Sequence, residues 1–241
     1  MPKMGRIIAL SALIALAGCS NTADEEQIEK AKLLGPEASY EVAKEMLKNG
    51  NFNGAAETLS NLDSRYPFGP LSLQIQLDLI YAYYKAGDAD QALAMVDRFI
   101  RLNPNHKDVD YAFYMRGLTN MESDTNLFQD LLNIDRSDRD PTATREAFND
   151  FRRLIERFPE SEYAADAQKR MTYLKDRLAK YEIAIARFYM RRGAYVAAAN
   201  RGQYVLEYFG DTAQVQPALE IMVSAYDQLG LEELKNNAIK I

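Results

Sequence analysis

The sequence predicts an all-α protein built from repeated helix pairs. Residues that favour helices recur at helical spacing between short breaks, and no run alternates apolar and polar residues as a half-buried strand does. The breaks also repeat. Three residue types share one offset of 37 residues, in the pairs Gly50 and Gly87, Ala55 and Ala92, and Pro67 and Pro104. We therefore expect a solenoid in which similar helix pairs stack side by side.

The composition narrows the classes of function. The chain has 241 residues, of which 47% are hydrophobic and 27% are charged, so most of it can fold around a core. Its net charge of −6 argues against binding nucleic acid, because that requires a dense cationic surface. The single cysteine and single histidine exclude an intramolecular disulfide framework and a Cys-based or His-rich metal site. We therefore expect no metal and no cofactor.

The N-terminal part of the chain predicts a membrane anchor. A basic head precedes an apolar run over residues 7–17, which is typical of a signal peptide and too short to span a bilayer. The run ends in Leu-Ala-Gly followed by Cys19, which resembles the bacterial lipobox. We expect residues 1–18 to be removed, Cys19 to carry acyl chains, and Ser20 to direct the lipoprotein to the outer membrane. Residues 19–35 are polar and charged, and they are interpreted as a lipidated, partly disordered tether.

Each helix pair follows one order: a helix, a glycine turn, a second helix with a small residue, and a closing proline. In the second pair, Gly87 supplies a left-handed turn, Ala92 lets the two helices approach closely, and Pro104 ends the second helix. These positions are typical of a tetratricopeptide repeat. The sequence therefore predicts a tetratricopeptide-repeat solenoid of about five helix pairs, with further turn glycines at Gly50, Gly193 and Gly230.

Two segments depart from the regular repeat. The third pair is interrupted by residues 123–140, an insertion that either folds back on its own repeat or contacts a partner. Residues 161–192 contain no Gly or Pro, so they form either one long, bent helix or two helices that meet near Ala179, and we favour one linking helix. The chain is thus divided into N-terminal repeats 1–3 over residues 36–160, and a linking helix with C-terminal repeats 4–5 over residues 161–241.

The sequence gives little reason to expect catalysis. It contains no nucleophile elbow, phosphate-binding loop or dinucleotide-binding glycine motif. His106 lies in an expected turn after a helix, where we interpret it as an exposed turn residue. Glu122-Ser123 and Glu160-Ser161 match a dipeptide of some peptidoglycan-cleaving enzymes but lack the rest of their motif. We therefore expect a binding protein and not an enzyme.

The first helix of each pair lines the concave face of such a solenoid, where partners bind. Residues three or four apart share one face of a helix. In the first three pairs this face combines aromatic and basic side chains, although the chain as a whole is acidic, and at least three of the tyrosines are expected to pack between helices. The candidate groove residues are Tyr40, Lys44, Lys48, Gln74, Tyr81, Tyr84, Lys85 and Tyr114.

Longer strings of the sequence resemble a known family. They are RYPFGP (65–70), QLDLIYAYYK (76–85), DRFIRLNP (97–104), MRGLTNM (115–121), DRSDRDP (135–141) and LKDRLAKYE (174–182). In these strings the chain resembles the BamD, or ComL-type, family of outer-membrane assembly lipoproteins, from about Tyr40 to the end. The resemblance implies five tetratricopeptide repeats on the periplasmic face of the outer membrane.

The resemblance also implies partners. Family members bind the POTRA domains of a BamA-type barrel subunit through their C-terminal repeats, associate with other assembly lipoproteins, and recognise unfolded outer-membrane proteins. Arg201 matches a family position at the contact with the barrel subunit. Arg192 and Arg191 lie nearby in register and are further candidates for this contact.

The groove suggests how unfolded barrel proteins are recognised. Such proteins commonly end in an aromatic residue with a free carboxylate. We expect Tyr81 and Tyr84 to flank the terminal ring, while Lys44, Lys48 or Lys85 pairs with the carboxylate. The N-terminal repeats would then bind substrates, and the C-terminal repeats would bind the assembly machinery.

Two other functions compete with this interpretation. One is a periplasmic repeat adaptor in cell-envelope or peptidoglycan organisation, which the family strings disfavour. The other is a DNA-uptake lipoprotein, which the ComL label suggests. Removal of residues 1–18 takes away Lys3 and Arg6, so the charge becomes −6 − 2 = −8, and an acidic surface disfavours contact with DNA.

Overall fold

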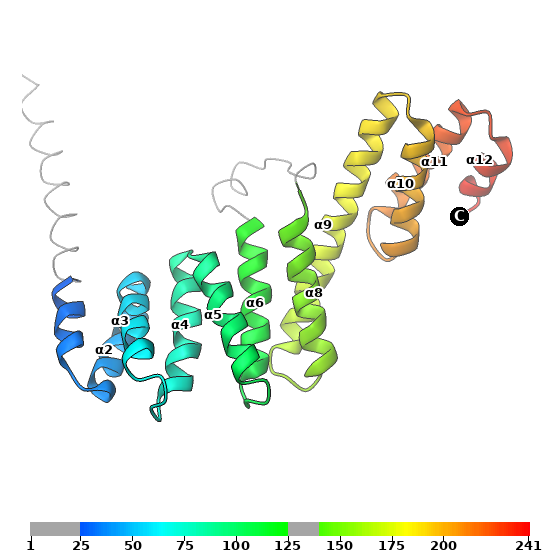
Figure 1. Cartoon of the computed structure of the whole chain (residues 1–241). Helices are drawn as coiled ribbons and strands as arrows, with labels where there is room; N and C mark the ends of the chain where they lie inside the picture. The colour runs from blue at the N-terminus through cyan, green and yellow to red at the C-terminus, as the bar shows by residue number, and fades with distance from the viewer. Residues whose placement is uncertain (1–24, 125–139) are drawn as a thin grey trace, which may run out of the picture. The chain divides into compact units, whose positions relative to one another are not determined.

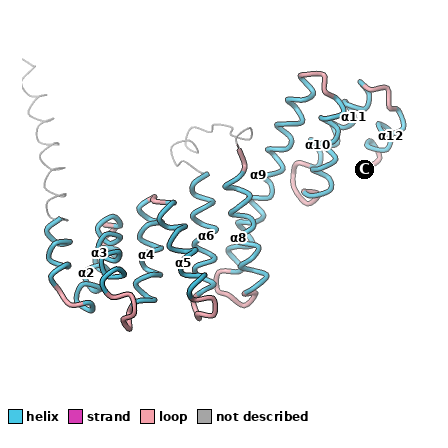
Figure 2. The backbone as a smooth tube through the Cα atoms, viewed as in Figure 1, coloured by secondary structure: helices cyan, strands magenta, loops and turns pink. Residues whose placement is uncertain are grey.

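The computed structural model describes residues 25–124 and 140–241, and all regular secondary structure in these two ranges is helical (Figures 1 and 2). The prediction of an all-α fold is therefore confirmed. Within the same ranges, every helix is too short or too polar to cross a membrane. The labelled helices are α2 (Pro36–Lys48), α3 (Phe52–Arg65), α4 (Ser72–Ala86), α5 (Ala89–Leu102), α6 (Val109–Asp124), α8 (Thr142–Arg157), α9 (Ala164–Arg191), α10 (Tyr195–Tyr208), α11 (Val215–Gln228) and α12 (Glu232–Ile239).

Four helix pairs turn on a glycine with a positive φ, as the repeat pattern predicts. The φ angles are 80° at Gly50, 77° at Gly87, 71° at Gly193 and 69° at Gly230. Only glycine adopts this left-handed region without steric cost, so the first helix of each pair ends there. At two of these turns a side chain then caps the next helix: Asn51 accepts from the Gly54 N–H and Asp88 from the Gln91 N–H.

The described residues fall into two compact units, the first reaching Met115 and the second beginning at Arg116. In the first unit, helices α2, α3 and α4 bury a shared core that includes Met46, Leu59 and Leu79. Ala55 and Ala92 are fully buried, as expected for small residues where paired helices meet. The predicted division between residues 160 and 161 is not tested by these units and stays a prediction.

In the second unit, α9 is one continuous helix of 28 residues, so the favoured interpretation of a single linking helix is confirmed. It packs against α8, α10 and α11. Its buried Ala179, Ile183 and Ala186 share a core with Ala198 and Val205 of α10. The alanines keep the helices close, which positions polar side chains of α9 and α10 for direct contact.

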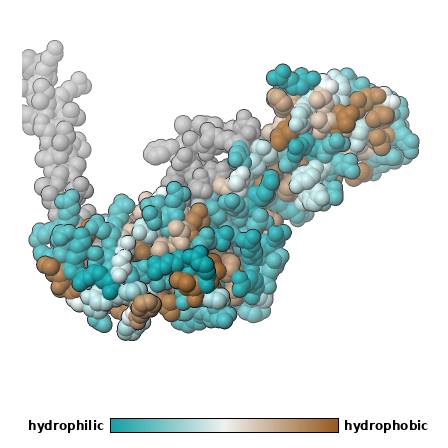
Figure 3. All heavy atoms as spheres, viewed as in Figure 1, coloured by the Kyte–Doolittle hydropathy of each residue, from teal (hydrophilic) through white to brown (hydrophobic). Residues whose placement is uncertain are grey.

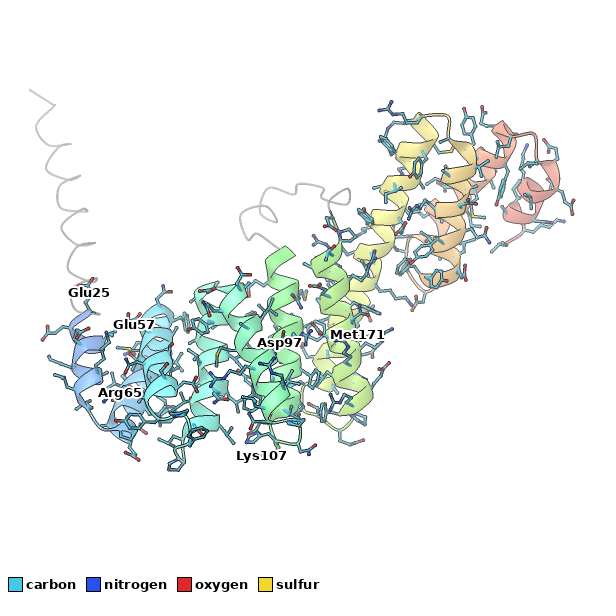
Figure 4. The ribbon with its side chains drawn as sticks, viewed as in Figure 1. Glu25, Glu57, Arg65, Asp97, Lys107 and Met171 are labelled. Carbon is cyan, nitrogen blue, oxygen red and sulfur yellow. The ribbon has the colours of Figure 1, made fainter. Side chains whose placement is uncertain are left out.

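Residues 25–33 are helical, which differs from the predicted tether. Ile28 and Ala31 are buried, and the Ala31 carbonyl accepts a hydrogen bond of 2.6 Å from the Ser39 hydroxyl. Two residues of α3, Arg65 and Glu57, also hold this helix at Lys32, and both are labelled in Figure 4. Arg65 donates to the Lys32 carbonyl at 2.7 Å, and the Glu57 carboxylate lies 3.0 Å from Lys32 Nζ. Ile28 and Ala31 lie three residues apart on one face of this polar helix, and their burial holds the segment against the first unit, whereas Leu33 is 87% exposed.

Several sequence predictions lie outside the described residues. The signal peptide over residues 1–18, Cys19 and the beginning of the tether all precede residue 25. Most of the predicted insertion, residues 125–139, lies in the other gap. These predictions stay predictions.

Candidate binding surfaces

The predicted groove face of the first unit has a carboxylate near its centre. Tyr40 of α2 is only 7% exposed, and its hydroxyl donates to Asp78 Oδ2 of α4 at 2.5 Å. Gln74, one turn before Asp78, donates to the other carboxylate oxygen at 3.0 Å. Burial, followed by the hydrogen bond to Asp78, raises the pKa of Tyr40 well above its usual value. Tyr40 and Gln74 therefore act within the protein, and Asp78 opposes an incoming carboxylate beside them.

The three predicted groove lysines are exposed but differ in their surroundings. Lys44 Nζ lies 2.8 Å from Glu41 and 5.3 Å from the centre of the Tyr40 ring. Lys85 Nζ lies 5.4 Å from the centre of the Phe52 ring, a favourable cation–π position. Lys48 lies in the last turn of α2. Lys44 is thus already neutralised by a carboxylate, whereas Lys85 contacts only an aromatic face among the interactions described here.

The groove tyrosines are only partly available. Tyr81 is 37% exposed, and its ring meets the Phe52 ring edge-to-face at 6.2 Å. Tyr84 and Tyr114 are half-buried, and the expectation that at least three groove tyrosines pack between helices stays a prediction. Asp78 and Phe52 were not predicted to lie on this face. Helical spacing could have found Asp78, because it lies four residues after Gln74 on the same face.

A separate cavity of about 520 Å³ lies along α3. None of the predicted groove residues lines it. Its walls come from α3, the end of α4 and the helix over residues 25–33, and the lining residues include Lys32, Asn53, Ser60, Asn61, Tyr83 and Asp88. This cavity could not be predicted from the sequence, because residues 25–33 were interpreted as a tether.

In the second unit, Arg201 is paired within its own chain. Its guanidinium lies 2.8 Å from the Glu182 carboxylate of α9, and Glu182 is only 5% exposed. This hydrogen bond raises the pKa of Arg201 above its usual value. The side chain of Arg201 nevertheless remains 41% exposed. Arg201 therefore pairs with Glu182 and still exposes part of its side chain to solvent.

Arg191 and Arg192 lie at the end of α9, and both are exposed. The Arg192 guanidinium lies 5.3 Å from the centre of the Phe188 ring. Arg201 pairs instead with Glu182, more than two helical turns before Arg191 on α9. The structure thus places the two candidates at the end of the α9–α10 pair and Arg201 along its length.

Two further buried carboxylates contact arginines. Asp63 lies 2.6 Å from Arg98 and accepts from Gln76 at 3.0 Å. Asp150 accepts from Asn120 at 2.8 Å and lies 3.3 Å from Arg116. Burial raises the pKa of Asp150, and the positive charge of Arg116 opposes that shift. Each pair joins residues of different helices, so these contacts fix the packing of the repeats.

The remaining candidate for chemistry is His106. Its Nδ1 accepts from the Asp108 N–H at 3.2 Å, and its ring packs edge-on against Phe99 at 5.4 Å. These contacts place it in the turn after α5, but its side chain is only 19% exposed, so the prediction of an exposed residue is wrong. Within residues 25–124 and 140–241, no three His, Cys, Asp or Glu side chains come together as metal ligands.

The sequence matches known proteins along nearly its whole length. Residues 34–241 match a family described as outer membrane lipoprotein. The chain is 48% identical to the outer membrane protein assembly factor BamD of Vibrio cholerae, over 96% of this chain and 94% of that protein. It is 41% identical to BamD of Neisseria meningitidis serogroup A, over 95% of this chain and 86% of that protein. Among solved structures, MamA matches 85% of this chain and 87% of its own, at 16% identity and a TM-score of 0.42.

Proposed function

The chain belongs to the BamD family of outer membrane lipoproteins, and we propose that it accordingly acts as an assembly factor for outer membrane proteins. One observation carries the proposal: the 48% identity with the Vibrio cholerae factor extends over 96% of this chain and 94% of that protein. Similarity along both chains supports a shared role rather than a shared repeat alone. The role is one of binding, in keeping with the aromatic and charged surfaces of both units.

Complementation tests this function. Vibrio cholerae cells depleted of their own BamD and supplied with this chain should retain folded barrel proteins in the outer membrane, measured by their heat-dependent migration in gels. An unrelated tetratricopeptide-repeat lipoprotein serves as the control and should not rescue them. If the chain reaches the outer membrane but barrel proteins are still lost, the alternative of a periplasmic adaptor in envelope organisation gains support.

The chain would work on the periplasmic face of the outer membrane, held by acyl chains on Cys19. The support is the order of basic head, apolar run and Leu-Ala-Gly-Cys in the sequence. Acyl chains contribute about 0.8 kcal/mol for each buried methylene, so several chains hold a protein firmly on a bilayer. The anchor would keep both units near the site where barrel proteins insert.

The second unit would bind the barrel subunit of the machinery through Arg201. Glu182 holds the guanidinium at 2.8 Å, while 41% of the side chain stays exposed. A guanidinium has five N–H donors, so it can bind a carboxylate of a partner while it keeps the bond to Glu182. Pairing within the chain thus orients Arg201 before the partner arrives. Other assembly lipoproteins would bind elsewhere on the chain.

The first unit would recognise unfolded barrel proteins near the ends of α2 and α4. Lys48 lies in the last turn of α2 and Lys85 in the last turn of α4. Tyr81 and Phe52 offer ring edges beside Lys85. Because Glu41 already pairs with Lys44 and Asp78 repels a carboxylate, the terminal carboxylate of a substrate would pair with Lys48 or Lys85.

A peptide titration tests this recognition. A short peptide that ends in Phe should bind more tightly than the same peptide with a C-terminal amide. The variant Lys48→Gln plus Lys85→Gln should remove that difference, whereas the matched control Lys44→Gln should keep it. If Lys44→Gln also removes the affinity difference between the two peptides, the terminal carboxylate binds nearer to Tyr40 than to Lys48 or Lys85. If neither peptide binds the unaltered chain, this face is not the substrate site.

A further inference from the structure

Three arginines cluster at the end of the α9–α10 pair. Arg187 and Arg191 lie in the last turns of α9, Arg192 caps that helix, and all three are exposed. Among the described residues none of the three forms an ion pair. Since α9 ends at Arg191 and Gly193 follows with a φ of 71°, the three arginines lie at the end of the helix, where the chain turns toward α10.

Two apolar side chains lie beside these arginines. Phe188 of α9 is 45% exposed, and Val196 in the first turn of α10 is 59% exposed. The Arg192 guanidinium lies over the Phe188 ring at 5.3 Å. We call Arg187, Phe188, Arg191, Arg192 and Val196 the arginine tip. In Figure 3 this end of the α9–α10 pair, uppermost in the second unit, combines strongly hydrophilic residues with hydrophobic ones.

Before the tip, several basic side chains of α9 have acidic partners. Three pairs along the helix illustrate this: Arg170 with Asp166, Lys175 with Asp211, and Lys180 with Asp176. The whole chain carries a net charge of −6. At the end of α9, by contrast, three exposed arginines without an ion pair among the described residues lie between residues 187 and 192.

We propose that the arginine tip docks on the surface of a bilayer that contains anionic phospholipids. Guanidinium groups match phosphate oxygens in charge and geometry. An exposed aromatic ring and an aliphatic side chain between them would enter the interface between headgroups and acyl chains. The combination favours a lipid surface over a soluble acidic protein, because charge and apolar groups meet at an outermost turn. This contact goes beyond the assembly role and does not depend on which proteins the chain binds.

The absence of tryptophan from the chain permits a direct test. Phe188→Trp places the only tryptophan in the tip of the full chain, which is reconstituted into vesicles, and the tryptophan is excited at a wavelength that the 15 tyrosines do not absorb. Phe68→Trp is the control, because Phe68 is 97% exposed in the first unit. With phosphatidylglycerol vesicles, the fluorescence of Trp at position 188 should shift to shorter wavelength and be quenched by brominated lipids. With phosphatidylcholine vesicles it should not, and the control fluorophore should respond to neither.

Charge removal sharpens the test. Each arginine strengthens partitioning onto an anionic surface about fivefold, so replacing all three should lower the bound-to-free ratio of the tip about a hundredfold. The variant carries Arg187→Gln, Arg191→Gln and Arg192→Gln in the Phe188→Trp background. The matched control, which removes the same charge elsewhere in the second unit, carries Arg145→Gln, Arg152→Gln and Lys169→Gln and should keep the shift. About 0.5 M salt should reverse the shift by screening.

Three results would overturn the proposal. Equal spectra of the position-188 fluorophore in both kinds of vesicle would show that the tip does not touch anionic lipid. A shift caused by inorganic phosphate alone would show a site for a soluble anion. A shift that requires addition of the purified barrel subunit, and not lipid, would show that the tip is a protein contact.

Discussion

At the scale of single residues, carboxylates that the sequence did not single out position the arginines. Asp63 pairs with Arg98 and Glu182 with Arg201, across 35 and 19 residues of sequence. Sequence spacing predicts contacts on one helix, but these pairs join different helices, so they depend on how the helices pack. Resemblance identified Arg201 as a partner residue, whereas the structure adds its bond to a buried carboxylate. That bond changes what substitution of Arg201 will do.

Substitution of Arg201 should separate folding from partner binding. Arg201→Glu would place a second carboxylate beside buried Glu182, and we expect a loss of about 2–4 kcal/mol in unfolding free energy. Arg201→Lys keeps the charge opposite Glu182 but loses the planar fork that binds a carboxylate through two hydrogen bonds. It should fold normally and co-purify poorly with the barrel subunit. Urea unfolding and co-purification measure the two effects, and full binding by the lysine variant would contradict the proposed role.

The buried Asp150 should make stability depend on pH. Burial raises its pKa above the ordinary value of 3.8. The folded chain therefore holds this proton more tightly than the unfolded chain, and this group's contribution to the unfolding free energy falls as pH rises from about 4 through the raised pKa. Relative to Asp150→Asn, the unaltered chain should lose stability over that range. Urea unfolding at several pH values measures this. A difference between the two chains that does not change with pH would contradict it.

At the scale of helices, the positions of Gly and Pro predicted the turns and helix boundaries better than the overall composition did. Glycines 37 residues apart predicted four turns whose φ angles lie between 69° and 80°. The absence of Gly and Pro after residue 160 predicted α9, although its 28 residues begin only at Ala164. The helix over residues 25–33 was missed, because Ile28 and Ala31 are too few to give a periodic signal without the surface of α3. The same error concealed the cavity along α3.

The α6–α8 contact offers a test of packing. A methyl group on Gly117 would lie 2.6 Å from the Phe151 ring, which is fully buried. Overpacking of this kind costs about 1–3 kcal/mol, more than the 0.5–1 kcal/mol that alanine gains over glycine within a helix. Gly117→Ala should therefore lower the urea midpoint. Gly35→Ala is the control, since a methyl group there meets nothing within 4 Å. Unchanged stability of Gly117→Ala would mean that the helices separate without cost.

At the scale of the whole molecule, the family strings predicted membership that the comparisons confirm, but they did not place the binding surfaces. Four of the predicted groove residues contact side chains that were not predicted to line the groove: Tyr40 and Gln74 meet at Asp78, whereas Tyr81 and Lys85 meet at Phe52. Helical periodicity gives the face of one helix. It does not give the side chain that a neighbouring helix brings to that face.

Anchoring is a property of the whole chain. Cys19→Ser should prevent acylation and leave the protein soluble or held at the inner membrane as an uncleaved precursor. Its circular dichroism should be unchanged, because the described helices begin at residue 25. Membrane fractionation measures the effect, and Ser20→Ala is a matched control that keeps the acylated cysteine. A Cys19→Ser variant that still fractionates fully with the outer membrane would mean that protein contacts, and not acyl chains, retain the chain there.

The four turn glycines also have a consequence for handedness. Every other residue type is chiral, and its L form disfavours the backbone conformation found at Gly50, Gly87, Gly193 and Gly230, at about 1–2 kcal/mol for each position. A D-residue would favour that same conformation. The turn position of each repeat is therefore reserved for glycine, the one achiral amino acid. This explains why its period can be read from glycines even where the hydrophobic residues around them have diverged between repeats.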